Sequence, residues 1–272
     1  MRGNAMRRAA AVLMLALAAT ACGPGESSVT AKRSLRIGVK ADQPGLGLLD
    51  PKTGRYSGFD VDVATYVAGK LGVPPERITF KTTPSSTREK ALAAGTVDMI
   101  FASYSITPRR KTQVTFGGPY YVAHQDTLVR ADDRTITNVR DLAGKRICAV
   151  SGSNSWKRVT EERAVKATPV EMATYSGCIA ALAAGRIDAL STDDLILAGY
   201  AAGTRTRVIN APFTDEKYGV GLRKGDLAGC EAVNRALTAM YQDGTAARLL
   251  ERWFGHSGLK INPYVPQFEG CS

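Results

Sequence analysis

The chain has 272 residues, which is enough for two medium α/β domains with a substantial core. Its formal charge is +11, and it falls to +8 once the three arginines of the N-terminal segment are set aside. The sequence has no basic block with interleaved aromatic residues, no zinc-ligand spacing and no basic helix, which argues against the common nucleic-acid-binding modules. A mildly basic surface suits an acidic ligand or an anionic envelope surface equally well.

Residues 1–21 have the pattern of a signal peptide, because two arginines precede an apolar run that is too short and too alanine-rich for a dependable membrane span. The small residues before Cys22, and the Gly-Pro-Gly-Glu-Ser-Ser that follows it, resemble the bacterial lipobox, although Ala19 stands where leucine is usual. In that class of signals the cysteine becomes the lipidated N-terminus. Ordinary secretion, with cleavage just before Cys22, is the alternative. Residues 22–33 are expected to form the lipidated cysteine and a flexible tether.

In the first half, apolar runs predict strands, and helical spacing with glycine stops predicts helices. The predicted elements are a strand over 35–39, an exit loop over 40–47, a helix from 59 to 71, a strand over 78–82, a helix that runs into 91–94, a strand over 97–101, and short extended stretches at 114–116 and 119–121.

Small hydroxyl residues and then arginines follow the predicted strand 97–101. Ser103, Ser105 and Thr107 come first, and Arg110 lies about one helical turn further on. In open α/β sheets, ligands bind in the crevice beyond the carboxyl ends of the strands. An arginine there offers a planar fork of donors that matches a carboxylate. A solvated charged turn is the alternative interpretation.

This unit is echoed later in the chain. Residues 91–100 read ALAAGTVDMI and residues 181–190 read ALAAGRIDAL, with six of ten positions identical. The echo predicts two similar helix–strand units, although alanine-rich joints can also resemble each other by chance. The second strand exits into a hydroxyl and carboxylates, Thr192 and Asp193 among them. If the two exits face each other, cations on one side and carboxylates on the other would clamp a small zwitterion.

The second half repeats the same order of elements, between two predicted crossings near 126–134 and 218–222. Ser153 and Asn154 precede a predicted helix, where they can cap the helix or leave backbone N–H groups free for an anion. The predicted elements are strands over 126–129 and 146–150, a helix over 156–165, a strand near 170, helices from about 176 and over 195–202, strands over 207–209 and 218–222, helices over 227–242 and 245–254, and an irregular tail.

Four cysteines remain once Cys22 is set aside, and an even number in an exported chain indicates disulfides. Four cysteines allow three pairings. We favour Cys148 with Cys178 and Cys230 with Cys271, because each bridge then stays within one domain and leaves a hinge free. Free buried thiols are the alternative. The sequence has no CxxC motif and only two histidines, so we expect no metal site and no cofactor.

An ordered set of motifs resembles a known family: the type II solute-binding proteins of ABC amino-acid importers, bacterial solute-binding protein family 3. The motifs are GFDVDVA (58–64), ALAAGTVDMI (91–100), SITPRR (105–110), FGGPYY (116–121), DLAGKRICAV (141–150), GRIDALSTDD (185–194) and GVGLRKGD (219–226). Within the family, the segment DQPGLGLLD, the cysteine placement and the leader are most similar to actinobacterial glutamate-binding lipoproteins.

The resemblance implies the two-lobe periplasmic-binding-protein type II fold, with each lobe a mixed sheet flanked by helices and with two crossover strands between the lobes. Residues 34–124 and 219–272 would form lobe 1, and residues 125–218 would form lobe 2. The lobes would close over one amino acid. The protein would be an exported monomer, anchored to the outer face of the cytoplasmic membrane through lipidated Cys22, and would deliver its ligand to permease and ATPase subunits.

The resemblance also assigns site residues. The residue for the ligand's α-carboxylate falls on Arg110, and that for its ammonium group on Asp193. Hydroxyl and backbone ligands fall on Ser103, Ser105, Thr107, Ser153 and Asn154. For a glutamate side chain, Lys40 and Arg88 are the first candidates, Lys157 is another, and Thr192 is a possible donor. The loop over 40–43 has no aromatic residue, which argues against a bulky apolar ligand.

Three functions follow in order of preference. The first is a binding protein without catalysis that captures a polar amino acid, with glutamate ahead of glutamine and aspartate. The second is an enzyme on the same fold, such as a cyclohexadienyl dehydratase, which would need an acid or base poised over the ligand. The third is a sensing ectodomain, which the absence of a second hydrophobic segment after Cys22 disfavours.

Overall fold

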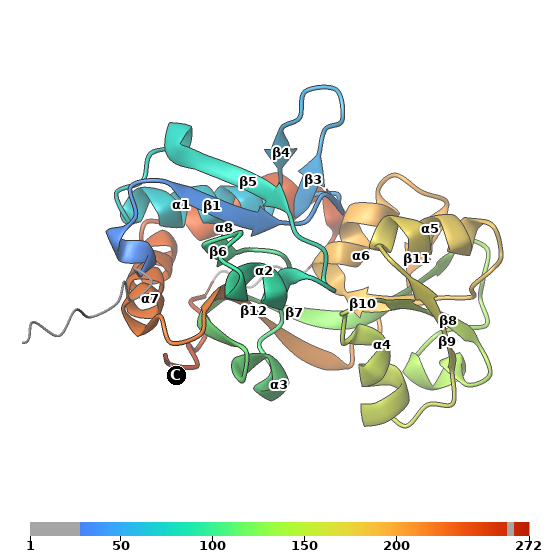
Figure 1. Ribbon diagram of the computed structural model, residues 1–272. Coiled ribbons are helices and arrows are strands. Elements are labelled where there is room, and N and C mark those ends of the chain that lie inside the picture. Colours follow the sequence, from blue (N-terminus) through green and yellow to red (C-terminus); the bar gives the residue numbers. More distant parts are fainter. Residues whose placement is uncertain (1–27, 260–263, 272) are drawn as a thin grey trace, which may run out of the picture.

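The computed structural model describes residues 28–259 and 264–271. The predicted signal peptide, Cys22 and residues 23–27 of the predicted tether therefore lie outside the described residues. In the described part, no helix is both long and apolar enough to cross a membrane. This part of the chain is a mixed α/β structure in which helices flank the sheets (Figure 1).

Two groups of elements lie side by side and are joined by the strands β7 (Val114–Arg130) and β12 (Thr214–Arg223) (Figure 1). We call the first group lobe 1; it holds the N-terminal strands and the C-terminal helices. Its elements are η1 (Val29–Ala31), β1 (Leu35–Val39), β2 (Asp42–Gln43), β3 (Gly47–Leu49), β4 (Tyr56–Ser57), α1 (Phe59–Lys70), η2 (Pro75–Arg77), β5 (Ile78–Thr82), α2 (Arg88–Ala93), β6 (Met99–Ile100), α3 (Pro108–Lys111), α7 (Leu227–Gln242), α8 (Thr245–Phe254) and η5 (Gly255–Ser257).

The second group, lobe 2, is one continuous stretch between the two connecting strands. Its elements are η3 (Val139–Leu142), β8 (Arg146–Val150), α4 (Ser155–Lys157), the π-helical turn η4 (Arg158–Glu162), β9 (Thr168–Met172), α5 (Tyr175–Ala183), β10 (Leu190–Asp193), α6 (Asp194–Ala201) and β11 (Thr206–Val208). In this lobe, β8 pairs with β9 in parallel.

One long sheet runs through both lobes, in the order β10-β7-β12-β6-β1-β5, with β11 also paired to β7. β1 pairs in parallel with both β5 and β6, whereas β12, β7 and β10 are joined by antiparallel pairing. Because β7 and β12 take part in the sheet in both lobes, they are the two crossover strands of the expected fold class. The carboxyl ends of the parallel strands point toward lobe 2, so their exit loops meet the other lobe.

The first crossover is longer than the sequence analysis predicted. The predicted short stretches at 114–116, 119–121 and 126–129 are one strand of 17 residues. Gly117, Gly118 and Pro119 resemble a turn locally, but β12 pairs along this whole region, from Arg223 opposite Val114 to Thr214 opposite Gln125. The pairing of β12 with β7 has a register shift between Tyr218 and Val220 and continues on both sides of it. Long-range strand pairing has therefore overridden the local turn signal.

The sequence echo corresponds to the same anchor in each lobe. Asp98 follows α2 and accepts hydrogen bonds from the backbone N and the guanidinium of Arg36, at the start of β1. Asp188 follows α5 and accepts the same two kinds of hydrogen bond from Arg146, at the start of β8. Each repeated aspartate thus fastens the beginning of the first strand of its own lobe, at the end opposite the strand exit.

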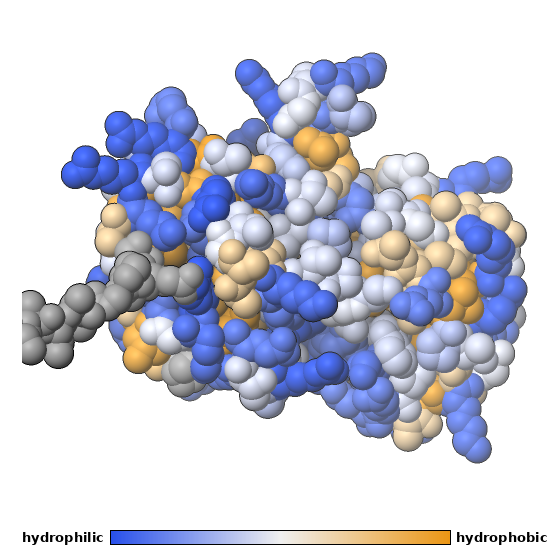
Figure 2. Space-filling model, viewed as in Figure 1, coloured by the Kyte–Doolittle hydropathy of each residue, from blue (hydrophilic) through white to orange (hydrophobic). Residues whose placement is uncertain are grey.

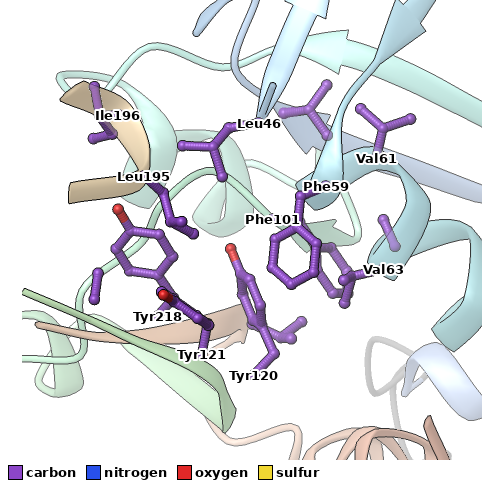
Figure 3. Packing of buried hydrophobic residues seen from close by; sticks show 14 of the residues in the cluster. Leu46, Phe59, Val61, Val63, Phe101, Tyr120, Tyr121, Leu195, Ile196 and Tyr218 are labelled. Carbon is purple, nitrogen blue, oxygen red and sulfur yellow. The ribbon is translucent and has the colours of Figure 1, made fainter. Parts of the chain in front are cut away.

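A buried aromatic cluster lies below the strand exits where the lobes meet. In Figure 3, Phe59 and Phe101 lie beside Tyr120. Tyr120 and Tyr121 in turn pack against Tyr218. Tyr120 comes from β7 and Tyr218 from β12, with ring centroids 6.0 Å apart. Leu46 of lobe 1 and Leu195 of lobe 2 belong to the same core, so apolar packing continues from one lobe to the other. On the face in Figure 2, by contrast, hydrophobic patches are small and scattered.

Two predicted boundaries differ from the structure. The helix predicted over 156–165 is α4 followed by the wider turn η4, because the chain must turn after Glu162 to reach β9. The predicted tether ends before residue 33. Val29 is buried against lobe 1, and its backbone N donates to Asp226 at the start of α7. An apolar side chain and a backbone donor are therefore enough to dock this segment.

Two disulfides connect the predicted pairs, Cys148 with Cys178 in lobe 2 and Cys230 with Cys271 in lobe 1. The second bridge holds the C-terminal tail against α7. In that tail, Glu269 accepts from Lys111 of α3 at 2.6 Å and from Lys217 of β12 at 3.0 Å. The tail thus contacts both α3 and the crossover strand β12.

Candidate functional site

The strand exits of the two lobes are in direct contact. Arg110 of lobe 1 donates from Nη2 to the carbonyl oxygen of Gly152 in lobe 2, at 3.1 Å. Gly152 has a φ of +77°, and an added Cβ would lie only 2.5 Å from the carbonyl atoms of Ser85. At a second point, the Asp42 carboxylate accepts from the backbone N of Ser176 at 3.1 Å. The lobes are therefore closed on one another, with the exit loops between them.

Arg110 is held in place by the chain around it. Thr107 caps the short helix α3 by accepting from the backbone N of Arg110, and the carbonyl oxygen of Ser105 accepts from Arg110 Nη1 at 2.8 Å. The side chain is buried, and burial, assisted by the nearby Arg88, lowers its pKa to about 10. A buried cation with donors fixed in one plane is suited to a carboxylate partner.

Arg88 lies beside Arg110 on the same aromatic ring. The guanidinium carbons of Arg88 and Arg110 are 3.9 Å and 5.1 Å from the ring centroid of Tyr104. The Tyr104 hydroxyl donates to Glu89 at 2.7 Å, and the same carboxylate oxygen is 3.6 Å from Arg110 Nε. Stacking and this one carboxylate hold two like charges close together. Although Arg88 lies in the first turn of α2, its side chain is buried and not solvated.

Lys40 adds a third buried cation on the lobe 1 side. Its Nζ donates to Ser85 Oγ at 2.5 Å. Burial, followed by the charge of Arg88, lowers the Lys40 pKa to about 7. The cluster formed by Lys40, Arg88 and Arg110 is richer in positive than in negative charge, so an anion is the complementary ligand.

Ser103 is fixed in an unusual backbone conformation, with a φ of +44°. Its backbone N donates to Asp60 Oδ2 at 2.8 Å, and Tyr120 donates to the other oxygen at 2.7 Å. Burial raises the Asp60 pKa to about 6. The Ser103 hydroxyl lies 3.0 Å from Gln43 Oε1. Asp60 therefore positions the loop after β6, which contains Ser103.

Asp193 is the acidic counterpart in lobe 2. Oδ2 accepts from the Tyr218 hydroxyl at 2.8 Å, whereas Oδ1 has no hydrogen-bond partner among the described residues. Burial raises the Asp193 pKa, the nearby Glu216 raises it further, and Arg110 lowers it. The positive charge of Arg110 therefore acts on Asp193 across the boundary between the lobes. An ammonium group next to Oδ1 would satisfy this carboxylate.

A cluster of hydroxyls completes the lobe 2 side. The Tyr175 hydroxyl lies 3.1 Å from both Ser153 Oγ and Thr192 Oγ1, and Ser155 Oγ lies 3.0 Å from Thr192 Oγ1. Tyr175 and Ser155 were not among the predicted site residues. In the sequence these residues look like ordinary first residues of helices, at the starts of α5 and α4. They come to lie beside Thr192 only when the chain is folded.

Several of the predicted site residues line a groove at the surface. This groove, of about 1000 Å³, is lined by residues of α3 and α4. Thr107, Asn154 and Lys157 line it, and Lys157 is 3.4 Å from Glu161. Arg110 and Ser153 also line this groove. Five other predicted residues are buried and do not line it, namely Lys40, Arg88, Ser103, Thr192 and Asp193. We call the enclosed group around Lys40, Arg88, Arg110 and Asp193 the cage.

Four buried side-chain atoms lack a hydrogen-bond partner in the described part of the chain. They are Gln43 Nε2, Arg88 Nε, Gln125 Oε1 and Asp193 Oδ1. Buried polar atoms are nearly always paired, so each of these atoms requires an explanation. The two donors belong to lobe 1 and the two acceptors to lobe 2 or its connecting strand. A ligand with a negative and a positive end would pair with both sides.

Comparison with known proteins gives a consistent result. The family model for bacterial extracellular solute-binding proteins, family 3, matches residues 35–256. The chain is 40% identical over 269 residues to glutamate-binding protein GluB of Corynebacterium glutamicum, covering 94% of this chain and 90% of that protein. It is 33% identical over 255 residues to the ABC transporter glutamine-binding protein GlnH of Bacillus subtilis, covering 89% and 93%.

Among solved structures, the ancestral amino-acid-binding protein AncCDT-1, a precursor of cyclohexadienyl dehydratase, superposes with a TM-score of 0.75 at 31% identity. The match covers 84% of this chain and all of that one. These similarities extend over both lobes and both crossover strands.

Proposed function

This chain belongs to the bacterial extracellular solute-binding proteins, family 3, and we propose that it captures glutamate between its lobes and delivers it to the permease of an ABC importer. One observation carries the proposal: the cage has cations on the lobe 1 side and an incompletely paired carboxylate on the lobe 2 side. A free amino acid has the complementary pair of charges.

The α-carboxylate is assigned to Arg110 and the ammonium group to Asp193. Arg110 is buried and donates from Nη1 to the carbonyl oxygen of Ser105 in its own lobe, so this part of its guanidinium stays held when the lobes open. Asp193 has one paired and one unpaired oxygen. Pre-organised charges lose less conformational freedom on binding than flexible ones do. Ser103, Ser105, Ser153 and Thr192 supply further polar atoms around these two groups.

A side-chain carboxylate is assigned to the remaining cations, Lys40 and Arg88. Both are buried, and in the described part of the chain their only nearby carboxylate within 4 Å is Glu89, 3.9 Å from Arg88. An acidic side chain would therefore lessen the positive charge of the cage. The similarity to GluB supports glutamate, while the similarity to GlnH keeps glutamine as the second candidate. Aspartate, with a shorter side chain, is the third.

Closure of the lobes is the proposed means of capture. We assign residues 34–124 and 219–272 to one rigid lobe and residues 125–218 to the other, with bending in β7 and β12. The strands β7 and β12 support this division, because they connect the two groups of elements. We further propose that the protein works as a monomer held at the outer face of the cytoplasmic membrane by lipidated Cys22.

We propose binding without catalysis. The named relatives GluB and GlnH are binding proteins, and the similarity to AncCDT-1 is to an amino-acid-binding precursor rather than to the dehydratase itself. An enzyme on this scaffold is the alternative. Prephenate and arogenate are the substrates that test it, and we expect neither to be converted.

Isothermal titration of the disulfide-bonded chain from residue 23 to 272 tests the proposal. We expect saturable binding of glutamate, weaker binding of glutamine and aspartate, and none of lysine. Arg110→Ala should abolish binding at micromolar glutamate, because loss of one partner of a buried charge pair costs about 2–5 kcal/mol. The matched control is Arg109→Ala, since Arg109 is the exposed neighbour on the same helix.

Failure of the wild-type protein to bind any of these amino acids would contradict the proposed function. Tighter binding of glutamine than of glutamate would still support an amino-acid-binding protein, but with glutamine as its ligand. Conversion of prephenate or arogenate would favour the enzyme.

A further inference from the structure

Gln43 presents a buried amide with one half unpaired. The side chain belongs to β2, in the exit loop of β1, and is fully buried. Its Oε1 lies 3.0 Å from Ser103 Oγ, and its Nε2 has no hydrogen-bond partner in the described part of the chain. A buried amide N–H₂ without an acceptor is costly, so this donor is expected to meet an acceptor that is not part of the protein.

The orientation of the Gln43 amide is fixed by its surroundings. Ser103, which binds Oε1, is itself held by Asp60, and Asp60 is held by Tyr120. This chain of buried hydrogen bonds connects the amide to the crossover strand β7. The Ser103 hydroxyl carries one proton and lies within reach of both Gln43 Oε1 and the carbonyl oxygen of Ala102. Because that carbonyl oxygen already accepts from Arg88, we assign the proton to Gln43 Oε1, which leaves Nε2 as the available donor.

The unpaired donor belongs to the same loop as Lys40 and is linked to Arg88 through residues 102–103. Lys40 precedes Gln43 by three residues in the same loop. Arg88 Nη1 donates to the carbonyl oxygen of Ala102, and the Ser103 hydroxyl lies 2.8 Å from that same oxygen. Gln43 and Arg88 therefore meet at the backbone of residues 102–103. Arg88 also has an unpaired donor, Nε.

We propose that Gln43 determines specificity by donating from Nε2 to the side-chain carboxylate of the ligand, together with Lys40 and Arg88. This inference rests on the proposed function and adds a residue to its site. It explains why the amide is buried with one half unpaired, and it makes Gln43, Lys40 and Arg88 a set of three donor side chains.

A set of donors distinguishes glutamate from glutamine. A carboxylate presents acceptors on both oxygens, so it pairs with Gln43, Lys40 and Arg88 together. The side-chain amide of glutamine presents one acceptor and one N–H₂ group, so at least one donor of the protein would face a donor of the ligand. Sites built on hydrogen bonds reject such mismatched analogues strongly, because their own buried groups are left unpaired.

Replacing the amide by a carboxylate tests the inference. Gln43→Glu has nearly the same shape but substitutes acceptors for the donor. We expect the Kd for glutamate to rise at least about 30-fold, and the Kd for glutamine to change by less than about threefold, or to fall. Gln242→Glu is the matched control, because Gln242 is exposed at the end of α7, far from the cage along the chain.

A second variant covers the case in which a buried glutamate prevents folding. Gln43→Met keeps the volume and removes the donor without adding charge. We expect its unfolding temperature to stay near that of the wild type, and the ratio of glutamine to glutamate Kd values to fall at least about fivefold toward one. The preference ratio is the deciding readout, because a purely structural role would weaken both ligands equally.

Equal losses for both ligands, or no change in either, would overturn the role of Gln43 while leaving the proposed function intact. A wild-type protein that binds neither ligand would instead overturn the proposed function and this inference with it.

Discussion

Arg110 and Gly152 are 42 residues apart in sequence and meet through a hydrogen bond of 3.1 Å between the guanidinium and the backbone carbonyl. Arg110 belongs to lobe 1 and Gly152 to lobe 2, so the residue assigned to the ligand's α-carboxylate also fastens the lobes together. Gly152 allows this approach because it has no side chain to meet Ser85.

Gly152→Ala is therefore expected to oppose closure. The new Cβ would lie 2.5 Å from the Ser85 backbone, a clash that opening the lobes relieves. We expect the Kd for glutamate to rise more than about tenfold, since the measured affinity falls with the fraction of protein that can close. Isothermal titration gives the Kd, and small-angle scattering with ligand shows whether the molecule still compacts.

Gly144→Ala is the control for backbone strain. Gly144 has a φ of +74° in the same lobe, but an added Cβ there would meet nothing within 4 Å. Both substitutions should cost about 1–2 kcal/mol of unfolding free energy, because both place alanine in a left-handed conformation. If Gly144→Ala weakened binding as much as Gly152→Ala, the explanation by closure would be wrong.

Lys40 should couple binding to proton uptake. In the ligand-free protein its pKa is lowered to about 7, so above pH 7 the amine is largely neutral. A carboxylate placed next to it favours the charged form and raises the pKa. Binding then takes up a proton, and the affinity contributed by Lys40 falls as pH rises above 7. The other charges that act on Lys40 are Arg88, Asp42, Arg110 and Asp60.

Titrations at about pH 8 in buffers of different ionisation enthalpy measure the number of protons taken up. Asp193 can release a proton when it meets the ligand's ammonium group, because its pKa is raised in the free protein. The contribution of Lys40 is therefore the difference between the wild type and Lys40→Met. Equal proton numbers in the two proteins would show that Lys40 does not meet the ligand's charge.

Asp193→Asn should weaken binding without weakening the fold. The substitution removes the charge that faces the ammonium group, which is expected to cost about 2–5 kcal/mol of binding free energy. The buried carboxylate has its pKa raised by folding, so it destabilises the free protein at neutral pH, and an amide of the same shape avoids this effect. Chemical denaturation should show unchanged or increased stability.

Asp132→Asn, at an exposed position in lobe 2, is the control for removing one negative charge. Loss of both stability and binding in Asp193→Asn would indicate a structural carboxylate instead of an ammonium-binding one.

The two disulfides should contribute separately to stability. Each closes a loop within one lobe, over 30 residues for Cys148 with Cys178 and 41 for Cys230 with Cys271. Replacing either pair by alanine should cost about 2–4 kcal/mol of unfolding free energy. Because the bridges lie in different lobes, the losses should add in the quadruple variant, as measured by denaturant titration. If the loss of unfolding free energy in the quadruple variant differed strongly from the sum of the two separate losses, the two bridges would not stabilise the protein independently.

Much of the fold could be predicted where the signal is local. Helices 227–242 and 245–254 have the same bounds in the structure as in the sequence analysis, because capping residues and glycines mark their ends. The strand 146–150 was equally clear. The single strand β7 was not, since its continuity depends on pairing with β12, about 100 residues later, and no local pattern reports that pairing.

The candidate site divides in the same way. Arg110 and Asp193 could be selected because each follows a strand exit, and the structure places both around the cage. Their contact with a ligand stays a prediction. Gln43 was passed over although it lies in the exit loop of β1, because a buried amide with one free half becomes visible only when Ser103, 60 residues away, is beside it. Tyr175 was missed for the same reason.

The repeated Asp98 and Asp188 anchors have a consequence for the energetics of capture. Each fastens the first strand of its own lobe, and neither spans the boundary between the lobes. Opening the molecule would therefore keep both anchors, while the contacts of Arg110 with Gly152 and of Asp42 with Ser176 would be lost. The choice of ligand and the equilibrium between open and closed lobes are then separable properties. Substitutions inside the cage would alter which amino acid is retained. Substitutions in β7 or β12 would shift the affinity for all amino-acid ligands together.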